Sequence, residues 1–287
     1  MAITENGMDL LRKRYFHEGE ESWSDLCRRV SIAIADAEET DELKAHWTNE
    51  FFNMMNNMEF IPSSPCLMNA QVDSPGQLSS CFIIDVKDSI QSIYMAKAKM
   101  AAIYQRNGGV GLNISTLRPK NSVVETSKGY SCGPVGFMEE FNLTTDIVTR
   151  NNNRRGALKI DLAVWHPDIY EFIHSKDDVD KLQFMNISVS IPNVFMEAVV
   201  NDEMWNLQFP DYSWNKEIYN AEWDGDIYEW INKDYPVKIY KTVRAKDLYR
   251  EIMESAHATG EPGVSFVDYM NDENPNPHLG KVMGTNP

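Results

Sequence analysis

The chain has 287 residues and a mass of 32.9 kDa, with 43% hydrophobic and 24% charged residues, an ordinary balance for a folded globular protein. Its 27 basic and 43 acidic side chains give a formal net charge of −16, so the surface as a whole should repel nucleic acid and anionic membranes. Charged side chains within residues 1–14 interrupt the apolar stretch that a signal peptide would need. No later apolar run approaches the roughly 18 residues of a membrane span. We therefore expect a cytoplasmic protein.

The cysteines do not form a structural framework. Four are present, at Cys27, Cys66, Cys81 and Cys132, and they contain no C-x-x-C pair. Their spacing fits neither a disulfide scaffold nor a zinc site, so we expect no metal. A functional cysteine among them would act through thiol redox chemistry.

The N-terminal part of the sequence has a helical pattern. Apolar residues recur at helical spacing over residues 8–58, interspersed with alanines that favour a helix. Two prolines flank a serine pair in the segment 60–70, which predicts an extended loop because proline removes backbone donors. We expect a helical domain at 1–60 and a second domain at 61–287.

Short apolar segments alternate with helical ones in the second region. Strands are predicted at 80–86, 108–114, 157–164 and 186–191, and helices at 90–105, 135–148 and 168–174. Strands joined by helices indicate a parallel sheet, so the predicted fold class is α/β. A last helix at 245–259 precedes a turn and another strand within 260–267.

The segment 201–236 has a composition of its own. It contains four tryptophans and nine acidic but only two basic residues. This composition predicts an exposed excursion from the α/β region, with small β elements of its own.

Basic residues concentrate between positions 104 and 160, where eight lysines and arginines accompany four acidic residues. Glycine amides, helix N-termini and arginine side chains are the groups that hold phosphate, so this segment favours a small phosphorylated ligand. A solvated basic surface is the alternative. The glycines at 108, 109 and 111 are not a dinucleotide fingerprint, because they precede a strand and the third glycine is missing.

Nine short motifs resemble the large catalytic subunit of ribonucleotide reductases in order and spacing. The motifs are PSSP at 62–65, QLSSCF at 77–82, DSI at 88–90, GGVG at 108–111, LRP at 117–119, RRGA at 154–157, HPDI at 166–169, NISV at 186–189 and TNP at 285–287. Residues 133–138, 154–157 and 166–173 are most similar to the adenosylcobalamin-dependent class II enzymes. The resemblance covers essentially the whole chain.

The resemblance implies a particular architecture. The family fold is a ten-stranded α/β barrel made of two five-stranded parallel half-barrels. This chain is similar to the N-terminal helical domain followed by the first half-barrel, with its effector and substrate loops. The remaining catalytic groups would lie beyond Pro287. We therefore expect a split enzyme that needs its C-terminal half, either by intein splicing or by non-covalent assembly.

The resemblance also implies the chemistry. The family converts ribonucleotides to deoxyribonucleotides by thiyl-radical chemistry, and a cysteine pair supplies two electrons while becoming a disulfide. Its position in the motif at 77–82 makes Cys81 the catalytic member of that pair in this chain. A thiol suits the role because an external dithiol can reverse its oxidation.

Three further sets of residues follow from the resemblance. The residues similar to substrate contacts are Ser64, Ser80, Cys81 and Gly109. The residues similar to the effector site are Asp88, Ser89, Ile90 and Arg118. The loop that links effector to substrate base corresponds to Arg154, Arg155, Gly156 and Ala157. His166, which precedes Pro167, is interpreted as a structural residue.

The implied cofactor is adenosylcobalamin, and the implied effector is a deoxynucleoside triphosphate or ATP. The expected partners are the C-terminal half, a ribonucleotide substrate, a thioredoxin- or glutaredoxin-type reductant and a second copy in a homodimer, with neither membrane nor nucleic acid. Two alternatives stay open. One is a class I large-subunit fragment that uses a separate radical-generating subunit, and the other is a non-catalytic nucleotide-binding regulator.

Overall fold

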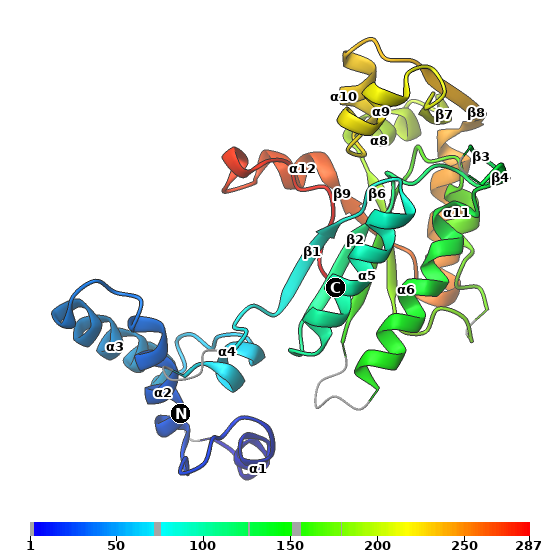
Figure 1. Ribbon diagram of the computed structural model, residues 1–287. Helices are drawn as coiled ribbons and strands as arrows, with labels where there is room; N and C mark the ends of the chain where they lie inside the picture. The colour runs from blue at the N-terminus through cyan, green and yellow to red at the C-terminus, as the bar shows by residue number, and fades with distance from the viewer. Residues whose placement is uncertain (1–2, 72–75, 126, 151–155, 179) are drawn as a thin grey trace.

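The computed structural model describes residues 3–71, 76–125, 127–150, 156–178 and 180–287. It has a helical N-terminal part and an α/β part built on a parallel sheet (Figure 1), which confirms the expected fold class. The helical part contains α1 (Glu5–Arg14), α2 (Trp23–Ala35), α3 (Asp41–Asn56) and α4 (Ser64–Asn69). Helix α2 begins with a capping box, in which the side chains of Ser22 and Asp25 each accept the other residue's backbone N–H.

The extended loop predicted at 60–70 is wrong for residues 64–69, which form helix α4. Pro65 lies in the first helical turn, where its missing N–H would have had no partner, so proline is compatible with a helix there. Arg29 of α2 donates to the carbonyl oxygens of Leu67 at 3.0 Å and Ala70 at 2.7 Å, and pairs with Glu20 at 2.6 Å. Helix α4 therefore packs with the preceding helices, and the domain boundary at 60 and 61 stays a prediction.

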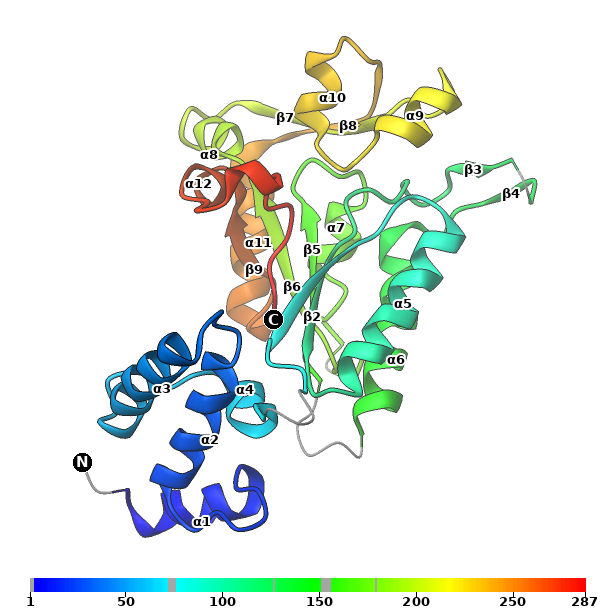
Figure 2. The same cartoon turned by 60° about the vertical axis from the view of Figure 1, so that its left-hand side comes forward.

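The α/β part is organised by one five-stranded sheet in which all neighbouring strands are parallel. Its strands, in spatial order, are β1 (Cys81–Asp85), β2 (Gly109–Asn113), β5 (Leu158–Ala163), β6 (Asn186–Ile191) and β9 (Gly263–Phe266). The helices that connect them include α5 (Ile90–Tyr104), α6 (Gly133–Thr149), α7 (Ile169–Ile173), α8 (Asn193–Val200) and α11 (Ala245–Thr259). In Figure 2, α5 and α6 lie on one side of the sheet and the C-terminal segment lies on the other.

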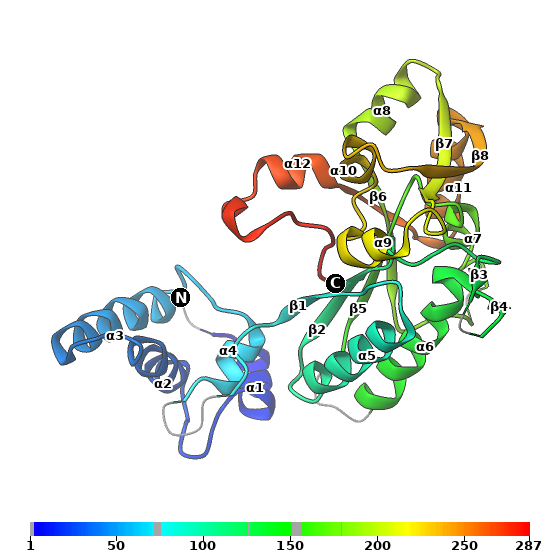
Figure 3. The same cartoon turned by 45° about the horizontal axis from the view of Figure 1, so that its top comes forward.

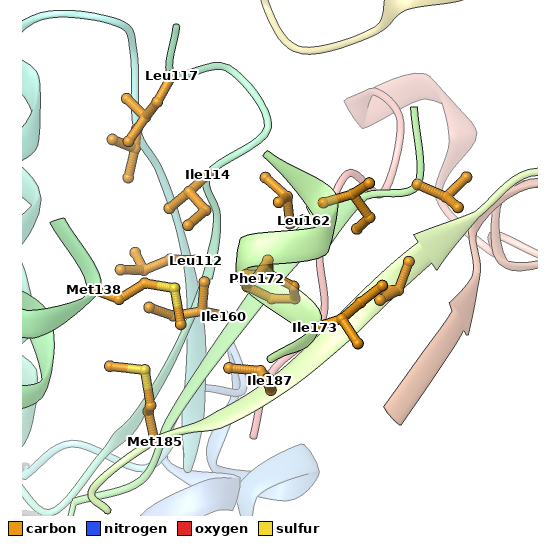
Figure 4. Packing of buried hydrophobic residues seen from close by; sticks show 14 of the residues in the cluster. Leu112, Ile114, Leu117, Met138, Ile160, Leu162, Phe172, Ile173, Met185 and Ile187 are labelled. Carbon is orange, nitrogen blue, oxygen red and sulfur yellow. The ribbon is translucent and has the colours of Figure 1, made fainter. Parts of the chain in front are cut away.

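The two faces of this sheet have different chemistry because side chains alternate along a strand. On the helix-covered face, Leu112 of β2, Ile160 of β5 and Ile187 of β6 are buried together with Met138 of α6 and Phe172 of α7 (Figure 4). Each such side chain contributes about 1.5–3 kcal/mol when removed from water. The opposite face is polar and rich in glycine, and the C-terminal segment covers part of it.

Smaller elements decorate this framework. Two antiparallel pairs join β3 (Val123–Val124) to β4 (Gly129–Tyr130), and β7 (Met204–Pro210) to β8 (Val237–Arg244). Helices α9 (Lys216–Glu222) and α10 (Ile227–Asn232) lie between β7 and β8, and the chain continues after β9 through α12 (Val267–Asp272) and a 3₁₀ turn, η1 (Pro277–Leu279).

The region between β7 and β8 has a core of its own, which corrects the expected exposed excursion, although the expected β elements are present. Trp223 and Trp230 are only 5% and 2% exposed and pack edge to face, with ring centroids 5.8 Å apart. The Trp223 indole donates to the carbonyl of Thr116 at 2.8 Å, which ties this core to the chain after β2. Trp214 is exposed.

None of the helices in the described ranges combines the length and apolar composition required to span a bilayer.

The packing of Phe172 leads to a stability prediction. This ring is fully buried, so Phe172→Ala should lower the free energy of unfolding by about 3–5 kcal/mol through lost burial and a residual cavity. Urea denaturation followed by circular dichroism measures the change. The matched control is Phe60→Ala at an exposed position, which should change it by no more than about 0.5 kcal/mol. Equal effects of the two substitutions would contradict the packing.

Candidate functional site

Cys81 begins the edge strand β1, directly beside Gly109 of β2. Its thiol is free and the residue is partly exposed. The N–H of Gly109 donates to the carbonyl of Ser80 at 2.7 Å, so this N–H is already occupied. A Cβ at residue 109 would lie 3.4 Å from the Cys81 Sγ. The structure thus brings Ser80, Cys81 and Gly109 together, and the missing side chain of Gly109 lets other groups approach the thiol closely.

The described end of the predicted specificity loop adjoins the same place. The carbonyl of Ala157 accepts the N–H of Val110 at 2.8 Å and lies 3.4 Å from where a Gly109 Cβ would stand. A Cβ at Gly156 would lie 2.8 Å from the Tyr104 ring, so only glycine fits there without displacing a buried tyrosine. Arg154 and Arg155 lie outside the described residues.

Ser64 has a different environment. It is the first residue of α4, and its Oγ lies 3.0 Å from the hydroxyl of Tyr15. That hydrogen bond joins two elements of the helical part. The substrate contact expected of Ser64 stays a prediction.

The predicted effector residues gather beyond the other end of β1. Asp88 accepts hydrogen bonds from Arg118 Nε at 2.7 Å and from the Arg118 backbone N–H at 3.1 Å. Its carboxylate also accepts the hydroxyl of Tyr219 of α9 at 2.7 Å. The Arg118 guanidinium lies over the Tyr212 ring, 4.8 Å from its centroid. The structure therefore joins Asp88 and Arg118 in one ion pair that two tyrosines hold in place.

Sequence reasoning missed both tyrosines. Tyr219 is 131 residues from Asp88 in the chain, and no local spacing connects them. Burial raises the pKa of the Tyr219 hydroxyl well above its ordinary value, and the neighbouring Asp88 carboxylate acts in the same direction. The hydroxyl is therefore a permanent donor to the carboxylate. The concentration of aromatic residues in 201–236 was the available signal.

Ser89 and Ile90 form the start of α5. The Ser89 Oγ caps the helix by accepting the N–H of Ser92 at 3.2 Å, and Ile90 is exposed. A hollow of about 250 Å³ lies at this helix start, lined by Asp85, Ser89, Gln91, Ser92, Met95, Ala96 and Lys99. Backbone donors of a helix N-terminus together with a lysine suit an anionic group.

His166 supports the chain beside Arg118 through hydrogen bonds at both ring nitrogens. Its Nε2 donates to the carbonyl of Leu117 at 2.9 Å, and its Nδ1 accepts the N–H of Asp168 at 3.1 Å. Complete burial lowers the pKa of His166 to about 4. Across the described ranges, no group of three or more His, Cys, Asp or Glu side chains is placed to hold a metal ion.

The C-terminal segment reaches the Cys81 end of the sheet. The chain end lies beside β1 and β2 in Figure 3, and Pro287 Cγ is 3.0 Å from where a Gly109 Cβ would stand. The Cys81 surroundings thus combine an edge strand, a glycine of the next strand and a segment from the far end of the chain.

Comparisons with known proteins match this architecture along the chain. The model of the ribonucleotide reductase all-alpha domain matches residues 1–75, and that of the ribonucleotide reductase barrel domain matches residues 79–287. These two modules, a helical domain and a barrel domain in that order, define the class of protein.

Curated relatives agree. A vitamin B12-dependent ribonucleoside-diphosphate reductase of Thermoplasma acidophilum is 37% identical over 243 residues, covering 84% of this chain and 28% of that protein. Its counterpart from Mycobacterium tuberculosis is 32% identical over 286 residues, covering 97% of this chain and 38% of that protein. The subunit alpha of a Synechocystis ribonucleoside-diphosphate reductase is 31% identical, covering 98% and 38%. The chain belongs to the ribonucleotide reductase large-subunit family and spans less than two-fifths of these relatives.

The buried His166 leads to a pH prediction. The pKa of His166 is about 4 in the folded chain and 6.5 ordinarily, so between these pH values the imidazole is protonated in the unfolded chain and neutral in the folded chain. Stability from this group is present above pH 6.5 and is lost as pH falls toward 4. His166→Gln should therefore cost stability at pH 7, and that cost should shrink by about 3 kcal/mol by pH 4.

Asp168 provides the opposing control. Burial raises the pKa of its carboxyl from 3.8 to about 6, so its contribution favours the folded state as pH falls through that range. Urea denaturation between pH 4 and 7 measures the free energy of unfolding of each variant. The stability lost in His166→Gln should grow as pH rises, whereas the stability lost in Asp168→Asn should shrink. A wild-type curve parallel to that of His166→Gln would contradict the assignment.

Proposed function

We propose that this chain is the N-terminal part of a ribonucleotide reductase, in which Cys81 is a redox cysteine that reduces a ribonucleotide. The observation that carries the proposal is the free, partly exposed thiol of Cys81 at the sheet edge, beside Gly109, in a chain of this family. The C-terminal half of the reductase is the required partner.

The proposed reaction balances with one further cysteine from that partner. Each of the two thiols gives up one hydrogen, the ribonucleotide loses its 2′ hydroxyl as water and gains hydrogen at C2′, and the sulfurs join as a disulfide. A thiyl radical from the C-terminal half starts the reaction by removing the 3′ hydrogen and returns it at the end. A thioredoxin- or glutaredoxin-type dithiol then reduces the disulfide by exchange. A reducing, cytoplasmic location belongs to the same proposal.

The roles of the surrounding residues follow from their contacts. The N–H of Gly109 is bonded to Ser80, so we assign to Gly109 a close backbone approach beside the Cys81 thiol rather than a hydrogen bond to substrate. Ser80 and Ser64 would contribute hydroxyl groups. Because a substrate beside Cys81 would also lie near Ala157, we assign residues 154–157 the link between effector and substrate base.

We place the effector, a deoxynucleoside triphosphate or ATP, at the start of α5. The helix N-terminus and Lys99 supply positive potential there, and Ser89 lines the hollow. Ile90 is the first residue of the helix and is exposed. The ion pair of Asp88 with Arg118 fixes the guanidinium nearby.

Adenosylcobalamin is proposed from the relatives, two of which bear vitamin B12-dependent names. His166 and His174 do not fit the role of a cobalt ligand. Both ring nitrogens of His166 are bonded in a buried site, and those of His174 lie 2.8 Å from Asp177 and Glu251. We therefore assign cofactor binding to the rest of the reductase and derive no step through it.

The central test combines this chain with the C-terminal half. With adenosylcobalamin, a dithiol reductant, effector and ribonucleoside di- or triphosphates, the complex should form deoxyribonucleotides over many turnovers. Cys81→Ser should reduce this rate to background because no disulfide can form. Cys132→Ser is the matched control at an exposed cysteine and should leave the rate unchanged.

The other outcomes separate the alternatives. Activity that requires a di-metal radical-generating subunit and ignores adenosylcobalamin would assign the chain to class I, a reading compatible with its Synechocystis relative. A soluble complex that binds effector without reducing ribonucleotides would contradict the proposal and indicate a regulator.

We further propose that the assembled enzyme is a homodimer through the outward faces of α5 and α6. These helices pack together and carry an ion pair between Lys97 and Glu140. Their exposed apolar side chains, spaced mostly one helical turn apart, are Ile90, Tyr94, Met95, Leu143 and Ile147. A face of this kind, next to the effector residues, suits a self-complementary interface.

A charge on this face should break the dimer. In the complex with the C-terminal half, Ile147→Glu should shift the sedimentation coefficient from dimer to monomer, because the new carboxylate would be buried without a partner. Val200→Glu places the same charge at an exposed valine of α8 and should leave the dimer intact. A dimer that persists in Ile147→Glu would place the interface elsewhere.

A further inference from the structure

A buried ion pair lies on the sheet face that carries Cys81. Lys159 and Asp161 are alternate residues of β5, so both project from the face opposite the aliphatic core. Lys159 Nζ lies 3.2 Å from Asp161 Oδ1, and the Asp161 side chain is completely buried. Ser265 of β9 bridges the pair, with its Oγ 3.2 Å from Lys159 Nζ and 3.3 Å from Asp161 Oδ1.

The remaining hydrogen bonds of this pair go to the C-terminal segment. The Thr285 backbone N–H donates to Asp161 Oδ2 at 3.1 Å, and the Thr285 hydroxyl lies 3.4 Å from the same oxygen. Lys159 Nζ donates to the Thr285 hydroxyl, and Asn113 of β2 donates to the carbonyl of Met283. A buried ion pair is stable only when its free lone pairs and protons are bonded, and Thr285 satisfies both partners.

Two glycines of β2 let the segment approach the sheet. A Cβ at Gly111 would overlap the carbonyl group of Thr285 and lie 3.1 Å from the Asn286 Cα. A Cβ at Gly109 would lie 3.0 Å from Pro287 Cγ and 3.4 Å from the Cys81 Sγ. The backbone of 285–287 therefore rests on the strand, and Pro287 lies close to the thiol.

We propose that Lys159 and Asp161 are positioning residues: they bind Thr285 and so determine where the chain from residue 285 onward lies relative to Cys81. We call this contact of Lys159 and Asp161 with Thr285 the seat. Ser265 holds the pair in register, and Gly111 provides the space. The catalytic meaning of this seat rests on the proposed function of Cys81, whereas the seat itself does not.

The test measures the seat directly in the 287-residue chain. Thr285→Val removes the hydroxyl while keeping the shape, and Gly111→Ala pushes the segment from the strand. Each should raise amide hydrogen exchange in 281–287 and the rate of Cys81 alkylation by iodoacetamide, by roughly fivefold or more, as local opening becomes easier. Peptide mass spectrometry reads both, with alkylation of the exposed Cys132 as the internal reference.

Matched variants separate seating from general loosening. Thr285→Ser restores the hydroxyl and should return both rates close to wild type. Gly263→Ala makes the same glycine change on the same sheet face, where a Cβ would meet the movable Ser188 hydroxyl instead of the segment, and should leave both rates unchanged. Asp161→Asn tests the pair itself and should match Thr285→Val, with circular dichroism confirming that the chain is folded.

Unchanged exchange and alkylation in both Thr285→Val and Gly111→Ala would overturn the proposal, as would a wild-type segment that exchanges like an unstructured peptide. Neither readout needs substrate, cofactor or turnover. Failure here therefore leaves the redox role of Cys81 standing, and an inactive reductase complex with a protected segment would leave the seat standing.

Discussion

The alternation of side chains across one parallel sheet is the constraint on which the rest of the molecule depends. In β2 and β5, every second residue enters the aliphatic core under α5 and α6, and the residues between them face the other way. The core side therefore dictates the register, and the register dictates which residues meet on the far side. Cys81, Gly109, Gly111, Lys159 and Asp161 share that far side because their neighbours are needed in the core.

Strand β1 has Cys81 at its start and leads to Asp88 after its end, so the two proposed sites lie at opposite ends of one strand. Cys81 stands at the first residue of β1, and Asp88 lies three residues beyond the end of the strand. At roughly 3.3 Å per residue, an extended chain from Cys81 to Asp88 spans at most about 23 Å. One strand thus connects the proposed redox centre with the proposed effector site, and the insertion between β7 and β8 is bonded to the chain near the latter through Tyr219 and Trp223.

Local sequence patterns predicted much of this framework. Strands and helices alternate where hydrophobic periodicity indicated, and the strand register places Cys81 beside Gly109. The errors arose where local rules omit tertiary partners. The prolines of 60–70 argued against α4, yet Arg29 stabilises its last carbonyl groups. The acidic composition of 201–236 argued for an exposed excursion, yet Trp223 and Trp230 are buried in a core there. Hydrogen bonds between residues more than a hundred positions apart, such as Tyr219 with Asp88, leave no periodic trace.

The sequence by itself determined the order of elements, the parallel α/β class and the family, because periodicity and short motifs are properties of neighbouring residues. Only the tertiary structure decided that Asp88 and Arg118 satisfy one another, and that Lys159 and Asp161 meet Thr285 from the far end of the chain. The physical reason is that a buried charge is stable only where its partners converge in space. That convergence depends on packing of the whole sheet and not on any segment of the chain.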